Sequence, residues 1–152
     1  MLRCLLVALA ALVLGAPSIA SAGSTRSEAS LLHAVNRVRA QHGLGRLRLD
    51  THLQRAARAH NREMVASNVF EHGSFGTRML QFDVSAHVAG ENLAWGTGTL
   101  GTPHQIVATW LASPQHRANL LRPSFTRVGI GEYVGSFQGY HGAHVVTADF
   151  AG

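Results

Sequence analysis

Hydrophobic residues recur with helical spacing in two stretches after the first 26 residues. The first stretch runs from Ser27 to Gly43, and this glycine suits the position that follows a helix C-terminus. The second follows a short extended segment at 47–49, with Asp50 or Thr51 as its capping residue. Its predicted buried stripe consists of Leu53, Ala56, Ala57, His60 and Met64. We therefore predict two amphipathic helices in the first half of the domain.

Residues 70–102 are rich in Gly and Phe and show no long hydrophobic period, so we expect a long irregular segment with at most one short helix near 78–82. Two further helices are predicted after it. Thr102-Pro103 and Ser113-Pro114 each place a capping residue before a proline at the first helical position. The hydroxyl of Ser113 is expected to accept a hydrogen bond from the backbone N–H of His116.

The C-terminal part alternates between apolar and polar residues, as a half-buried strand does. One predicted strand spans 128–134 and the other 144–150, with a Gly-rich loop at 135–142 between them. This pattern predicts an antiparallel hairpin. Because strands do not alternate with crossover helices, we predict an α+β domain in layers, with a small antiparallel sheet between helices.

The N-terminus has the three parts of a cleaved secretory signal. A basic start is followed by an apolar run of about ten residues and by the small-residue site Ala20-Ser21-Ala22. We expect residues 1–22 to be removed, 23–27 to be a short flexible start, and 28–152 to form one domain. Cys4 is the only cysteine, so the mature chain is predicted to have no disulfide. The expected location is extracellular, with the periplasm as the alternative.

Composition narrows the classes of partner. The chain has 152 residues, of which 46% are hydrophobic, and it carries 13 Arg, no Lys and 8 acidic residues. No apolar run reaches the roughly 18 residues that a membrane span needs. Arg55, Arg58 and Arg62 lie opposite the buried stripe of the second helix, either as a solvated face or as a patch for an anionic polymer or membrane surface. Because no dense basic cluster with aromatic platforms is present, we expect no nucleic-acid partner.

Three polar residues stand in apolar or Gly-rich surroundings, where a charge or an imidazole is costly unless it is paired. They are His72, Glu91 and His116. Neither a G-x-S-x-G elbow nor an H-E-x-x-H helix is present, so the common serine-hydrolase and zincin signatures are missing.

The chain resembles the CAP superfamily, which comprises cysteine-rich secretory, antigen 5 and pathogenesis-related proteins, and above all its bacterial secreted branch. The resemblance covers residues 28–150. It rests on the stretch 43–53, Phe70-Glu71-His72, Gly90-Glu91-Asn92, the block from Trp110 to Leu121, and the stretch 125–131.

This resemblance implies a three-layer α-β-α sandwich with a central cleft lined by two His and two acidic residues. The imidazoles correspond to His72 and His116, and the first acid corresponds to Glu91. Many members have the second acid three residues after the helix Trp, where this chain has Ser113. Members of the family bind a divalent cation, often zinc, some bind lipids elsewhere on the domain, and peptidase activity has been claimed for a few.

Three interpretations of the cluster stay open. In the first, His72 and His116, with Glu91 as a further candidate ligand, hold an exchangeable Zn²⁺ or other divalent cation in an extracellular binding module. In the second, the ion activates water in a hydrolase or peptidase with Glu91 as general base. In the third, the polar groups only hold the loops together and bind no ion. The domain could then bind a lipid without a metal. Asn92, Ser113 and Arg117 are expected to support the cleft.

The ligand class is left open among lipid, cell-wall polymer and peptide. We expect a monomer.

Overall fold

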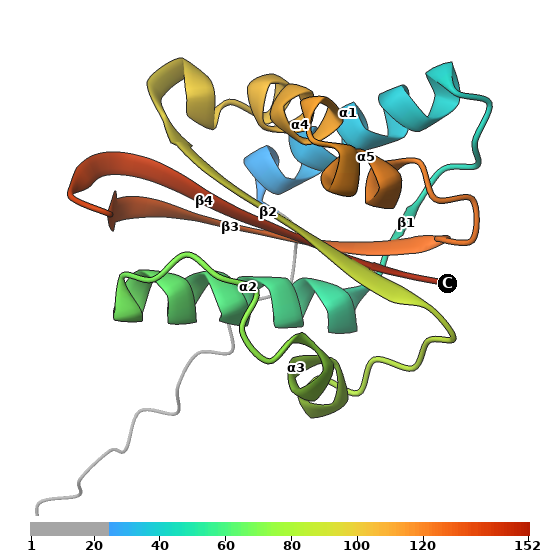
Figure 1. The fold of residues 1–152 in the computed structure, drawn as a ribbon, viewed down its shortest axis with the longest axis horizontal. Helices are drawn as coiled ribbons and strands as arrows, with labels where there is room; N and C mark the ends of the chain where they lie inside the picture. The colour runs from blue at the N-terminus through green and yellow to red at the C-terminus, as the bar shows by residue number, and fades with distance from the viewer. Residues whose placement is uncertain (1–24) are drawn as a thin grey trace, which may run out of the picture.

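The computed structural model describes residues 25–152, and the predicted signal and Cys4 lie outside them. A sheet is sandwiched between two layers of helices, which confirms the predicted α-β-α architecture (Figure 1). One layer holds α1 (Arg26–Gln41), α4 (Pro103–Ala112) and α5 (Pro114–Leu120). The other holds α2 (Thr51–Ser67) and α3 (Phe75–Gln81). No helix of residues 25–152 is long and apolar enough to cross a membrane.

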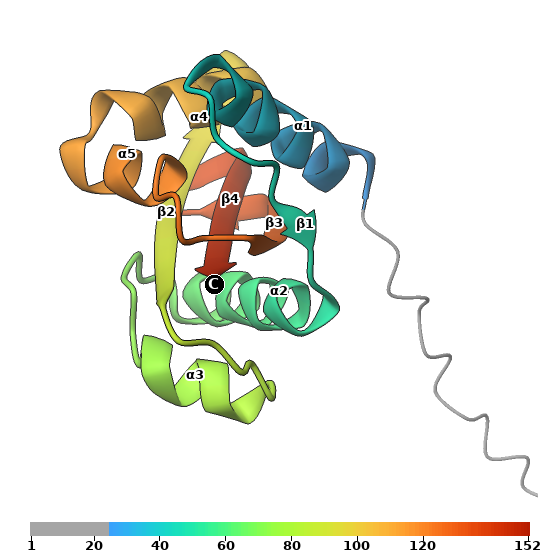
Figure 2. The same ribbon diagram turned by 90° about the vertical axis from the view of Figure 1, so that its right-hand side faces the viewer.

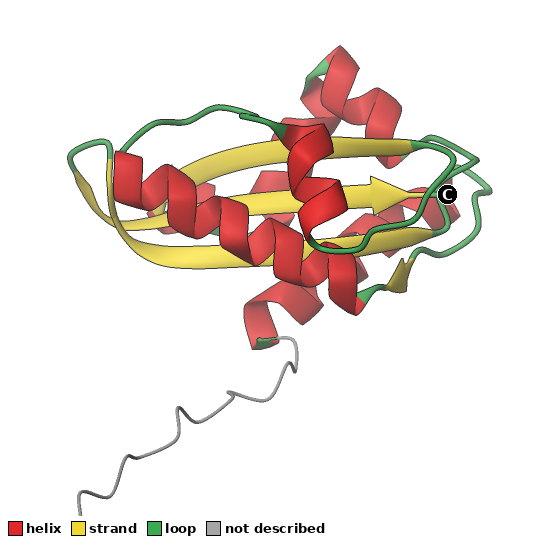
Figure 3. Ribbon diagram, turned by 90° about the horizontal axis from the view of Figure 1, so that it is seen from below, coloured by secondary structure: helices red, strands yellow, loops and turns green. Residues whose placement is uncertain are grey.

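The two N-terminal helices begin and end at the capping signals in the sequence. At the start of α1, Thr25 and Glu28 form a reciprocal capping box. Gly43 follows the end of α1 with a φ of 69°, which a residue with a side chain rarely adopts. At the start of α2 the carboxylate of Asp50 accepts from the backbone N–H groups of His52 and Leu53. The predicted inward stripe of α2 is buried throughout, and this helix runs along the sheet in Figure 3.

The sheet has four strands in the order β1-β3-β4-β2. They are β1 (Arg48–Leu49), β2 (Ala89–Thr97), β3 (Arg127–Phe137) and β4 (Tyr140–Ala151). The expected antiparallel pairing is confirmed for β2, β3 and β4, whereas the two-residue β1 pairs parallel to β3 and makes the sheet mixed. The hairpin of β3 and β4 is confirmed, although both strands reach into the expected loop and leave Gln138-Gly139 as the turn.

Strand β2 corrects the expectation that residues 70–102 are irregular. Helix α3 is the predicted short helix, beginning three residues earlier than expected, but β2 and a 3-10 turn at Gly98–Gly101 follow it. The segment Glu91–Ala94 is buried, since helices cover both faces of the sheet there. A strand buried on both faces does not alternate between apolar and polar residues, and this one has few β-branched residues. The usual strand signal is therefore missing.

The edge position of β2 matters for the site, because it has β4 on one side only. Two of its carbonyls accept hydrogen bonds from side chains of the helical layer above. Trp110 Nε1 donates to the Leu93 carbonyl at 2.9 Å, and Asn119 Nδ2 donates to the Glu91 carbonyl at 3.1 Å. These bonds fix α4 and α5 against the strand.

Close packing brings α2 onto the other face of the sheet. A Cβ added to Gly129 of β3 would lie 2.0 Å from the backbone carbon of Leu53. Only a glycine at this position lets the helix backbone approach so closely. The polar side chains of this interface include Gln54, Asn61 and Thr147, all nearly fully buried.

Candidate functional site

The centre of the site is Glu91, which lies on the face of β2 toward α2 and α3 and is 7% exposed. Its Oε1 lies 2.7 Å from Nδ1 of His72. His72 belongs to the loop between α2 and α3, which rises beside β2 in Figure 2, and more than half of its side chain is exposed. Since Nδ1 of His72 faces the carboxylate, Nε2 is the ring nitrogen left for a ligand.

Arg78 of α3 is the second partner of Glu91, and the sequence motifs did not single it out. Its Nη2 donates to Oε2 of Glu91, and its Nη1 donates to the His72 carbonyl at 3.3 Å. The guanidinium therefore holds both the carboxylate and the loop. The sequence contained one signal for it, because Arg78 lies at helical spacing from Phe75 and Phe82 and so shares their face of the helix.

Asp149 of β4 lies beside Glu91 and Arg78, and the sequence analysis did not identify it. It is paired in register with Glu91, has no exposed surface, and lies 4.0 Å from Nη2 of Arg78. Burial raises the pKa of Asp149 well above its ordinary value, and the neighbouring Glu91 carboxylate raises this pKa further, against the effect of Arg78. The protonated, uncharged form of Asp149 is favoured as a result.

His60 of α2 supports the loop that carries His72. Its Nε2 lies 2.9 Å from the Glu71 carbonyl and 3.9 Å from Oε2 of Glu91, and the residue is 1% exposed. The sequence placed His60 in the buried stripe of its helix but assigned it no contact with the site. The contact between His60 and the Glu71 carbonyl holds the backbone immediately before His72.

His116 belongs to α5, which lies in the opposite helical layer on the other side of the edge strand β2 (Figure 2). Burial lowers the pKa of His116, and the nearby His72 lowers it further, so the neutral imidazole is favoured. Its Nδ1 is buried and has no hydrogen-bond partner among residues 25–152. The hydrogen bond between His72 and Glu91 and the influence of His72 on the pKa of His116 connect these three residues, which we call the His72–Glu91–His116 cluster.

Asn92 fixes the backbone that carries His116. It has no exposed surface, and its Nδ2 donates to the His116 carbonyl at 3.0 Å. Asn119 in turn donates to Oδ1 of Asn92 at 2.9 Å. Because both amides connect β2 to α5, they hold the two sides of the cluster in one position. Arg117 is exposed in the last turn of α5, and no hydrogen bond of its side chain to the cluster is found in the described chain.

Ser113 departs from its expected role. It occupies the N-cap position of α5 with Pro114 after it, but its hydroxyl makes no capping hydrogen bond. Ser113 is also the residue that ends α4, so its backbone serves two helices: its N–H donates to the Trp110 carbonyl, and its own carbonyl accepts from Arg117 N–H at 2.8 Å. The backbone rather than the hydroxyl makes this junction.

The number of available ligand atoms limits which metal ions the cluster can hold. No group of three or more His, Cys, Asp or Glu side chains in residues 25–152 is arranged to hold a metal ion. Glu91 is already bound by His72 and Arg78, which leaves the two imidazoles as the available nitrogen ligands. Such an arrangement matches an open site completed by water or ligand, not a closed structural zinc site.

Comparisons with known proteins agree with this architecture. The family model described as "CAP: Cysteine-rich secretory protein family" matches residues 32–150. The protein YkwD of Bacillus subtilis (strain 168) is 38% identical over 121 residues, which cover 76% of this chain but 44% of YkwD. The chain therefore spans less than half the length of this relative.

Two solved structures share the fold. An extracellular protein containing an SCP domain from Bacillus anthracis superposes with a TM-score of 0.67 and 27% identity, over 82% of this chain and 40% of that one. An outer surface protein from Borrelia burgdorferi also has a TM-score of 0.67, with 23% identity over 84% of this chain and 93% of that protein.

Proposed function

Because the chain belongs to the cysteine-rich secretory protein (CAP) family, we propose that it is an exported binding module in which His72 and His116 hold an exchangeable divalent cation. Export is supported by the N-terminal signal pattern and by the extracellular description of the similar Bacillus anthracis protein.

The hydrogen bond between Glu91 and His72 carries this proposal. A carboxylate that accepts from one ring nitrogen fixes the tautomer and leaves the other nitrogen as a metal donor, which is the usual arrangement around histidine ligands. Glu91 therefore orients His72 rather than acting as a ligand itself. Arg78 keeps the carboxylate in place by binding its other oxygen.

His116 fits the role of the second ligand. Its lowered pKa favours the neutral ring, which is the form that binds metal, and its buried Nδ1 has no hydrogen-bond partner in the described residues. Asn92 and Asn119 hold the helix that carries it. A bound cation would supply a Lewis acid for an oxygen or nitrogen of the ligand.

The geometry favours binding over hydrolysis. A general base must reach the proton that it removes, but the Glu91 side chain is only 3% exposed and both of its oxygens already accept hydrogen bonds. Ser113 is a poor nucleophile candidate, because no hydrogen bond joins its hydroxyl to a base in the described chain.

Calorimetric titration of zinc into the exported protein at pH 7.5 tests the proposal. We expect saturable binding that is strongly weakened in His116→Ala and unchanged in His87→Ala, a control at an exposed histidine outside the cluster. If the parent protein binds no zinc, or if His116→Ala binds as tightly as the parent, the cluster is a loop-bracing network and the proposal fails.

A further inference from the structure

Charged residues are divided unevenly between the two helical layers. Of the eight acidic residues, only Glu28 belongs to α1, α4, α5 and the segments beside them at 26–47 and 98–126. Glu28 is buried and bound by Arg58 of α2. The same segments contain six arginines: Arg26, Arg37, Arg39, Arg46, Arg117 and Arg122. This layer therefore presents positive charge to solvent without an exposed carboxylate.

Arg39 adds to this charge from inside the layer. The residue is 1% exposed, and its guanidinium donates to the carbonyls of Gly45, Leu120 and Phe125 at 2.9 to 3.1 Å. None of these partners is a carboxylate. Its positive charge is therefore solvated by carbonyl dipoles but not cancelled, and it contributes to the potential outside the layer.

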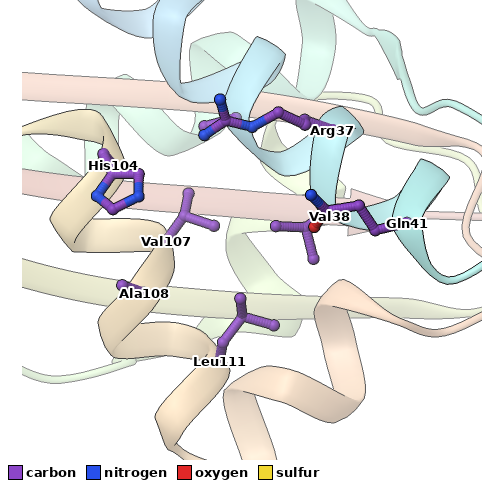
Figure 4. A pocket seen from close by; sticks show the side chains of 8 residues that line it. Arg37, Val38, Gln41, His104, Val107, Ala108 and Leu111 are labelled. Atoms are coloured by element: carbon purple, nitrogen blue, oxygen red, sulfur yellow. The ribbon is translucent and has the colours of Figure 1, made fainter.

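Arg37 lines two cavities of this surface. One cavity, of about 250 Å³, lies between α1 and α4, and Figure 4 shows the Arg37 guanidinium at the same end of it as His104. The other, also about 250 Å³, has His33 and Arg46 on its walls. The Arg37 side chain is exposed and makes no hydrogen bond or ion pair within residues 25–152. We call the two cavities and the residue that lines both of them the Arg37 groove.

The large exposed apolar residues of the protein do not line this groove, although Val38, Val107 and Leu111 form part of the wall between α1 and α4 (Figure 4). The large exposed ones among the described residues are Leu49, Val69, Phe70, Leu80, Leu100, Tyr133, Val134 and Tyr140. None belongs to α1, α4 or α5, and Leu100, in the 3-10 turn before α4, is the one member of this set in the described segments of the layer. A single apolar side chain is a small anchor for a lipid surface. The described segments of the layer also lack the exposed aromatic rings on which nucleic-acid bases stack.

We propose that the Arg37 groove binds a linear polyanion whose charges are phosphate groups. A guanidinium presents parallel donors that match a phosphate in two-point hydrogen bonding, and Arg37 is free to do so. Since Arg37 lines both cavities, a chain can cross α1 with one phosphate on Arg37 and its neighbours toward His104 and Arg46. The groove uses none of the residues of the His72–Glu91–His116 cluster.

The experiment uses the exported protein and inorganic polyphosphate as the probe, titrated at several salt concentrations up to 150 mM. We expect saturable binding, weakened at least about tenfold by Arg37→Glu, since a like charge then faces the polymer. The milder Arg37→Ala is expected to lower the slope of log affinity against log salt by about one, the contribution of one phosphate contact. Arg62→Glu makes the same charge change on the exposed face of α2 and should weaken binding less than about threefold.

Several results would overturn the proposal. One is equal weakening by Arg37→Glu and Arg62→Glu, which would mean that net charge alone attracts the polymer. Absence of saturable binding at 150 mM salt is another. Tighter binding to anionic phospholipid vesicles or to a single-stranded oligonucleotide, at equal phosphate concentration, would point to a membrane or to nucleic acid instead. Zinc titration of Arg37→Glu distinguishes this proposal from the cation site, because we expect the variant to bind zinc as tightly as the parent protein does.

Discussion

Arg78 and Glu91 form a buried ion pair that joins α3 to the edge strand β2, with side chains that are 7% and 3% exposed. The pair is the main polar link between this short helix and the sheet. His72 and Asp149 both depend on it, since one shares the Glu91 carboxylate and the other faces the same guanidinium. A change at either member therefore affects His72 and Asp149 at once.

Replacing Arg78 tests this dependence. Arg78→Met should destabilise the protein by about 3–5 kcal/mol, because it leaves a buried carboxylate without its cation. Urea unfolding followed by circular dichroism measures the change. The matched control Arg62→Met, on the exposed face of α2, should stay within about 0.5 kcal/mol of the parent. A loss below about 1 kcal/mol in Arg78→Met would show that the ion pair contributes little.

Asp149→Asn should change the pH dependence of stability. A carboxyl whose pKa is raised on folding stabilises the native state fully only below its unfolded pKa, near 3.9, and this contribution is lost as pH rises through the folded pKa. The asparagine mimics the protonated acid and has no such loss. The variant should therefore gain stability relative to the parent between pH 4.5 and pH 7, by up to about 1.4 kcal/mol per pH unit. Urea unfolding at both pH values checks this, and a constant difference would refute it.

Zinc affinity should fall steeply from pH 7.5 to pH 5.5. Protons compete with the ion for the imidazoles, whose ordinary pKa is near 6.5. The lowered pKa of His116 keeps this ring available further into the acid range than an ordinary histidine. Titration calorimetry at the two pH values measures the effect. Affinity that does not change with pH would exclude the imidazoles as ligands.

Ser113→Ala should cost less than about 0.5 kcal/mol, because the hydroxyl makes no capping hydrogen bond. Asp50→Ala is the comparison, since Asp50 does cap α2 and its loss should cost about 0.5–2 kcal/mol. Thermal or urea unfolding ranks the two. Equal losses in both variants would mean that Ser113 caps α5 in solution.

Gly129→Ala should destabilise by about 1–3 kcal/mol or more, because the added methyl group meets the α2 backbone and not a movable side chain. Gly45→Ala is the matched control, since its Cβ would have no neighbour within 4 Å. Urea unfolding of both variants separates close packing from a general effect of glycine. Similar stability in both would contradict the close approach.

The sequence predicted the elements whose signals are local. The stripe of α2 and the hairpin of β3 and β4 follow from spacing alone, and the order of the motifs around His72, Glu91 and His116 indicated the family. Strand β2 was missed because burial on both faces removes alternation. Its partner β4 comes about 50 residues later, and no local pattern records that pairing.

The missed site residues share a cause. Arg78 and Asp149 are ionisable groups at positions where the pattern calls for apolar side chains. Arg78 is tolerated because Glu91 pairs with it, and Asp149 because burial raises its pKa and favours the uncharged acid. Both effects come from tertiary structure. Ser113 shows the reverse case, since a strong local capping signal failed where two helices share one residue.

The bonds from Trp110 and Asn119 to the carbonyls of β2 have a consequence for self-association. The outer strand of an open sheet is a template on which another chain can add a strand, and this is a common route to aggregation. In β2, the carbonyls of Leu93 and Glu91 already accept hydrogen bonds from these two side chains of the same domain. A second copy could pair with β2 only after displacing a fully buried tryptophan. Strand addition by a second copy at this edge of the sheet is therefore disfavoured.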